Sequence, residues 1–222
     1  MAALDAGRTF RRLLRGAFAF AGMLAFSVAQ GADVPVHLSD LYATLDEVAP
    51  HVRAYPPKFS SPEEREQVES RLKNLLKTTD KILERYPDNL EILYVRGAGN
   101  AMGHELDFPG AAENAIASFE RLLAIDPSNR RAAYFYAVFL SRTTLLDKAV
   151  VYCKKAIELG VEQAHYTLAV TYVEKGDVQK AQPELEAFLK FEPNNASAQQ
   201  MLAEMKAGTF TRHVVVHHGP GN

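Results

Sequence analysis

The residue types best suited to chemistry stand together in one short segment, residues 104–110. His104, Glu105 and Asp107 offer an imidazole and two carboxylates, which are common ligands of divalent metals. A zinc-protease motif would need a second histidine four residues after the first, but position 108 is phenylalanine. The segment therefore predicts a structured loop in which Phe108 packs against its neighbours. A small metal-dependent or hydrolytic enzyme that uses this loop is the alternative.

Other reactive side chains are few. The single cysteine, Cys153, falls on the apolar side of a helical pattern, which predicts a core residue and excludes an internal disulfide. His213, His217 and His218 make a histidine-rich tail, for which a solvated segment is favoured over a metal site. The sequence has neither a phosphate-binding glycine loop nor a nucleophile elbow. We therefore assign no catalytic residue, no cofactor and no metal ligand.

The N-terminus has the layout of a secretory signal peptide. Four arginines within residues 8–15 precede the uncharged, mostly apolar run 16–28, and small residues follow. A helix over that run would span about 20 Å, whereas a bilayer core is about 30 Å thick. We expect residues 1–29 to be removed by cleavage after Ala29, or after Gly31 or Ala32. The mature protein would then be periplasmic or secreted; an uncleaved anchor and a mitochondrial presequence are the alternatives.

Composition indicates a globular, all-α protein. The chain has 222 residues, of which 47% are hydrophobic, and a formal net charge of −2, so no basic surface suggests nucleic acid as a partner. Residues 33–89 are expected to form an N-terminal helical extension, which begins with an extended leader at 33–38. It contains a short helix near 40–52, a proline-containing connector at 54–60, and a helix that Ser61 caps and that ends near Tyr86.

From residue 90 the pattern repeats. Gly97, Ala137 and Ala169 are small residues inside apolar helical patterns, and the latter two are followed twelve residues later by Ala149 and Ala181. A period near 34 residues indicates an array of helical hairpins. We expect three hairpins, with helices near 90–103 and 111–124, 130–143 and 146–159, and 162–174 and 178–190. An unpaired helix at 196–206 would cap this 90–208 domain, and 209–222 would be a flexible tail.

The array resembles tetratricopeptide repeats. In the third repeat Leu168, Ala169, Tyr172, Gly176, Ala181 and Pro193 match the family pattern, as Gly97, Ala115, Phe119 and Pro127 do in the first. The second repeat has Val161 where the family usually has proline, and the first carries six extra residues at its turn. The resemblance implies an all-α, right-handed α-solenoid of about three hairpins, which binds protein or peptide partners along a concave face.

The resemblance places the partner-binding residues on the first helix of each hairpin. Tyr94, Tyr134 and Tyr166 share one offset from the small residue of their helix. They are either the contact row for a partner or the packing residues between helices, because tyrosine serves both roles. The predicted surface consists of Tyr94, Ala98, Ala101, Arg131, Tyr134, Val138, Arg142, Gln163, Tyr166, Val170 and Glu174.

These observations favour an exported adaptor or scaffold that binds a protein or peptide, without nucleic acid and without a membrane span in the mature chain. A self-assembling structural module, in which hairpins stack end to end, is a further alternative to the enzyme.

Overall fold

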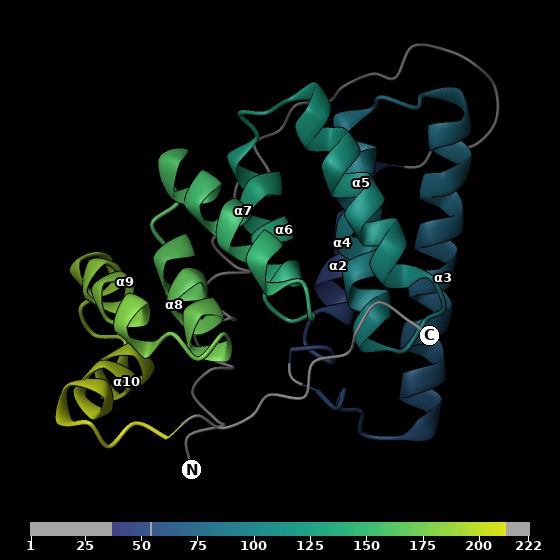
Figure 1. Ribbon diagram of the computed structural model, residues 1–222. Helices are drawn as coiled ribbons and strands as arrows, with labels where there is room; N and C mark the ends of the chain where they lie inside the picture. The colour runs from purple at the N-terminus through teal and green to yellow at the C-terminus, as the bar shows by residue number, and fades with distance from the viewer. Residues whose placement is uncertain (1–36, 54, 212–222) are drawn as a thin grey trace.

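The computed structural model describes residues 37–53 and 55–211, and all regular structure in these residues is helical. The predicted signal segment 1–29, its cleavage sites and the tail beyond Thr211 lie outside the described residues. Successive helices pair side by side from α3 to α10 (Figure 1). Their bounds are α2 Leu38–Val48, α3 Pro62–Arg85, α4 Leu90–Glu105, α5 Ala111–Ile125, α6 Arg130–Leu140, α7 Leu146–Glu158, α8 Ala164–Glu174, α9 Val178–Phe191 and α10 Ala196–Ala207.

The predicted hairpins are present as the pairs α4–α5, α6–α7 and α8–α9. Small residues allow their helices to cross closely. A Cβ added to Gly97 of α4 would lie 3.0 Å from the Phe119 ring of α5. Ala137 and Ala169 are fully buried at the corresponding places of the second and third hairpins. The spacing of small residues in the sequence therefore marks real contacts between helices.

The turns between hairpins follow a local rule that our sequence analysis overlooked. Pro87, Pro127 and Pro193 each stand two residues before an asparagine, and this asparagine is the N-cap of the next helix. The side-chain oxygens of these residues accept from backbone N–H groups at 3.0–3.1 Å, in Asn89, Asn129 and Asn195. A proline that ends one helix and an asparagine that starts the next thus fix both boundaries. The junction before α8 lacks both residues, and α8 has no side-chain cap.

Two helices, α2 and α3, precede the hairpins, and the bounds of α2 differ from those expected. The short helix α2 begins at Leu38 and ends at Val48, earlier than the expected 40–52. Ser61 caps α3 by accepting from Glu64 N–H at 3.2 Å, and the Glu64 carboxylate accepts from the backbone N–H of Ser60. Pro62 fills the first position of the helix. This long helix packs along α4, and α2 lies against both.

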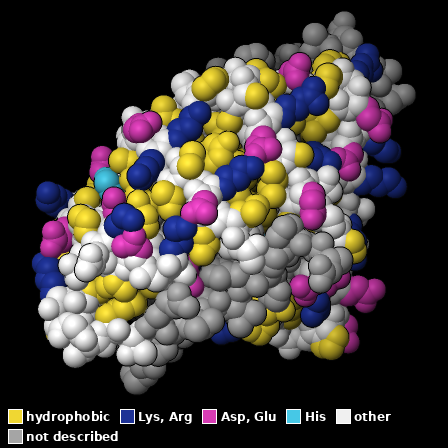
Figure 2. Space-filling model, viewed as in Figure 1, with side chains coloured by type: hydrophobic (Ala, Val, Ile, Leu, Met, Phe, Trp, Pro, Cys, Tyr) yellow, Lys and Arg dark blue, Asp and Glu magenta, His cyan; other side chains and the backbone are white. Residues whose placement is uncertain are grey.

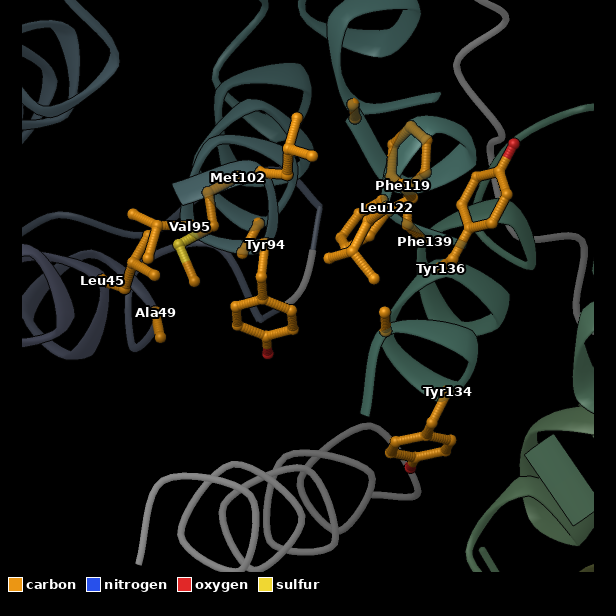
Figure 3. Packing of buried hydrophobic residues seen from close by; sticks show 14 of the residues in the cluster. Leu45, Ala49, Tyr94, Val95, Met102, Phe119, Leu122, Tyr134, Tyr136 and Phe139 are labelled. Atoms are coloured by element: carbon orange, nitrogen blue, oxygen red, sulfur yellow. The ribbon is translucent and has the colours of Figure 1, made fainter. Parts of the chain in front are cut away.

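Two clusters of apolar side chains form the core. The larger runs from α2 to the start of α8. The smaller joins α8, α9 and α10 with Ala137 of α6 and Cys153 of α7. Phe119 and Tyr136 stack across the first two hairpins with their ring centroids 5.4 Å apart (Figure 3). In the described part of the chain no helix combines the length and apolar character needed to cross a membrane.

Candidate protein-interaction surface

The first part of the predicted surface, on α4, is covered by the chain's own N-terminal helix. Tyr94 is buried, with its ring 6.4 Å from the ring of Tyr42 in α2. The Arg131 guanidinium lies 3.5 Å from the centre of the Tyr94 ring. The Tyr42 hydroxyl donates to Glu91 at 2.5 Å and accepts from Arg131. Burial raises the pKa of Tyr94 above its ordinary value, so this ring is a neutral packing element between α2, α4 and α6.

A second polar contact involves Arg53, which follows α2 in the chain. Arg142, in the turn that follows α6, makes a bidentate pair with Glu105 at 2.8 and 2.9 Å. Its third interaction is a hydrogen bond of 3.1 Å to the backbone carbonyl of Arg53. Charge-assisted bidentate pairs are among the stronger polar contacts in proteins. Arg131 and Arg142, both predicted to line a partner site, therefore bind residues of this chain.

The structure corrects the predicted surface at three positions. Tyr94, Ala98 and Tyr134 have only 3%, 3% and 7% of their surface exposed, which is too little to offer a partner an extensive contact. Phe135 lies between the two tyrosines, since its ring meets the Tyr94 ring edge-on at 5.5 Å and the Tyr134 ring edge-on at 6.0 Å. The tyrosines at these positions thus serve the packing role that the sequence left open. The shared offset therefore places Tyr94 and Tyr134 at packed positions on α4 and α6.

The remaining predicted residues are partly exposed. Val138 on α6 and Tyr166 and Val170 on α8 retain accessible side-chain surface, and the Tyr166 ring packs at 5.1 Å from Phe188. Also partly exposed are Ala101, Gln163 and Glu174. The structure therefore divides the predicted surface into a part on α4 that α2 covers and a part on α6 and α8 that keeps accessible apolar groups. We call these the covered part and the α6–α8 part.

Charges of both signs are distributed among the apolar groups on the face of the molecule seen in Figure 2. No block of a single sign dominates that view. Such mixing does not define a site for anions or for cations. This face therefore gives no support for a partner that is attracted by net charge.

The end of α4 and the loop after it do not bring together the residues that suggested a metal site. Glu105 is committed to Arg142, and His104 is buried with its ring edge-on to Phe139 at 5.8 Å. Asp107 is exposed and adopts a positive φ of 60°. Within residues 37–53 and 55–211, no group of three histidine, cysteine or acidic side chains is placed to hold a metal ion. Phe108 packs against α4, because a Cβ on Gly103 would lie 3.0 Å from its ring.

Cys153 lies in the core, as its spacing predicts. It is fully buried, and burial raises the pKa of its thiol to about 12. The thiolate, which is the nucleophilic form, is therefore scarce near neutral pH.

Tyr42 of α2 and Glu91 of α4, which form a hydrogen bond where α2 covers α4, are not among the residues predicted from the sequence. One clue was present, because Tyr42 stands three residues before Leu45, as Tyr94 stands three residues before Gly97. Leucine at the position of the small residue concealed the correspondence.

Comparison with known proteins agrees with this architecture. Residues 162–195 match the family model described as a tetratricopeptide repeat. A crystal structure of MamA is similar with a TM-score of 0.56 and 20% sequence identity, over 68% of this chain and 86% of the other. A comparison with curated proteins gave no match.

Two further solved structures are less similar. MamA from residue 41 to the end, from Desulfovibrio magneticus RS-1, has a TM-score of 0.48 and 18% identity over 86% of this chain and 98% of its own. YrrB, described as a TPR protein with an unusual peptide-binding site, has a TM-score of 0.39 and 17% identity, over 74% and 97%.

The repeat match, the helical hairpins and the similarity to the MamA structure define the class of fold. The chain contains a tetratricopeptide repeat at residues 162–195, and the fold of its described residues is an all-α solenoid.

Proposed function

We propose that this protein is a scaffold that binds a protein partner through the α6–α8 part of its surface. The observation that carries the proposal is the partial exposure of Val138, Tyr166 and Val170 on the first helices of two consecutive hairpins. Partly exposed valines on α6 and α8, together with a partly exposed tyrosine on α8, combine apolar area with a hydroxyl, which suits a peptide or an amphipathic helix. Gln163 and Glu174 stand at the two ends of α8 and supply polar groups at the rim.

The proposal is tested with the full chain and a matched pair of substitutions. Val170→Asp places a charge in the proposed contact, whereas Val151→Asp changes a residue of α7 that is 61% exposed. Proteins retained on immobilised wild type from envelope extracts are identified, and their affinities for the variants are then measured. We expect Val170→Asp to weaken binding about thirtyfold or more, a hot-spot loss of about 2 kcal/mol, and Val151→Asp to leave it unchanged.

Equal binding by the two variants would contradict the assigned surface. Thermal melts of both proteins accompany the measurement, because Val170 is only partly exposed and its replacement must leave the fold intact.

We further propose that the scaffold acts outside the cytoplasm, in an envelope complex. The basic, apolar and small-residue order of the first 29 residues supports export. Protein purified from its native host is expected to begin at Gln30, or near Asp33 if cleavage is later. N-terminal sequencing checks this, and a mature protein that starts at Met1 or Ala2 would rule out export by cleavage.

A further inference from the structure

The N-terminal helix makes an intramolecular contact that has the composition of a protein–protein interface. Leu41, Leu45 and Val48 of α2 are at most 5% exposed and lie in one apolar cluster with Val95 and Met102 of α4. Figure 3 shows Leu45 beside Val95 and Met102. The buried positions of α2 follow the i, i+4, i+7 pattern of a helix that docks in a groove.

Polar contacts surround this apolar centre. Tyr42 meets Glu91 and Arg131 near one end, and the carbonyl of Arg53 meets Arg142 near the other. An apolar centre with tyrosine and arginine at its edge is the usual anatomy of a binding surface.

The charged groups under this contact do not depend on α2 for their partners. Arg131 has Glu91 at 3.4 Å and the ring of Tyr94 at 3.5 Å, and Arg142 keeps its bidentate pair with Glu105. Removal of α2 would therefore leave no isolated buried charge, which is the costliest consequence of breaking a polar contact.

Helix α3 packs on α4 through contacts that do not involve α2. A Cβ added to Gly99 of α4 would lie 3.0 Å from Leu75 and 3.6 Å from Leu72, and Arg96 pairs with Asp80 at 2.6 Å. Residues 49–61 connect α2 to α3 and separate the two helices along the chain. The α3–α4 contact can therefore persist when α2 is displaced.

We propose that residues 37–53 form a strap that closes the covered part of the surface, and that a partner helix with the same side-chain pattern displaces it. The partner would carry aliphatic residues at i, i+4 and i+7, with a tyrosine directly after the first, as α2 does with Leu41, Leu45, Val48 and Tyr42. The proposal rests on the proposed scaffold function and extends its surface from the α6–α8 part to α4.

The test uses the full chain and a fluorescent synthetic peptide of residues 37–53. Leu45→Asp puts a charge at a fully buried strap position and leaves every groove residue unchanged. Leu38→Asp is the matched control, because Leu38 is on the same helix but 38% exposed. We expect Leu45→Asp to bind the peptide at least tenfold more tightly than wild type or Leu38→Asp, and a peptide carrying Leu45→Asp to bind none of them.

Hydrogen exchange on the wild type gives an independent readout that does not require any variant to fold. Amides of residues 41–48 are expected to exchange at least tenfold faster than the central amides of α4 and α6, because the strap opens without global unfolding. Equal exchange of the three helices would overturn the proposal, as would a folded Leu45→Asp protein that fails to bind the peptide. Dimerisation of the wild type that depends on its concentration and uses residues 37–53 would assign the groove to a second copy of the chain. This result would also overturn the proposal.

These outcomes are separable from the scaffold proposal. The Val170→Asp experiment concerns α8 and does not involve α2, so failure of the strap leaves the proposed function on the α6–α8 part untouched.

Discussion

Replacement of Phe119 by alanine is expected to lower the free energy of unfolding by about 3–5 kcal/mol. The side chain is fully buried in α5 and joins three helices. Its ring stacks on Tyr136 of α6 at 5.4 Å, meets Tyr94 edge-on at 6.2 Å, and contacts the backbone side of Gly97. Deletion of the ring removes these contacts and leaves a cavity between the first two hairpins.

Chemical denaturation monitored by circular dichroism measures this loss. Phe191→Ala is the matched control, because Phe191 ends the corresponding helix of the third hairpin and is 47% exposed. We expect the control substitution to lower the free energy of unfolding by about 1 kcal/mol or less, because only a small buried apolar area is removed. Similar losses for the two variants would show that Phe119 is not the packing centre between the hairpins.

Replacement of Arg142 by alanine is expected to lower the free energy of unfolding by about 2–4 kcal/mol. Breaking a buried ion pair usually costs about 3–5 kcal/mol, and partial exposure of the guanidinium lowers the expectation. The side chains of Arg142 and Glu105 are 29% and 10% exposed, so the carboxylate that remains would be poorly hydrated. The hydrogen bond to the Arg53 carbonyl would be lost as well.

Two further variants separate the buried pair from general effects of charge. Arg71→Ala breaks the pair with Glu47, whose side chains are 56% and 52% exposed, and should cost about 0–1 kcal/mol. Glu105→Gln added to Arg142→Ala should recover part of the loss, because a neutral amide is less costly to bury than a carboxylate. Equal denaturation midpoints for Arg142→Ala and wild type would contradict the assigned role of this pair.

Local features of the sequence predicted most helix boundaries. The expected helix 111–124 is observed as Ala111–Ile125, and 178–190 as Val178–Phe191. Proline, glycine and periodic apolar residues act within a few positions of themselves, so their effects can be read from a single segment. The asparagine caps after Pro87, Pro127 and Pro193 are equally local, and a search for the Pro-x-Asn pattern would have found them.

The candidate surface was harder to predict, because it depends on which helix covers which face. Exposure on α8 agrees with the sequence pattern at Tyr166 and Val170, whereas the same offset on α4 and α6 gives buried Tyr94 and Tyr134. Periodicity identifies the face of a helix that a residue occupies. It does not reveal what lies against that face.

The sequence by itself determined the repeat, the helices and the small residues at their crossings, because each depends on neighbouring residues or on a regular spacing. Only the tertiary structure decided that residues 37–53 cover the first part of the surface. Tyr42 reaches Glu91 across 49 positions and Arg131 across 89. Contacts at such separation arise from the packing of whole helices, and no local pattern in either segment specifies its partner.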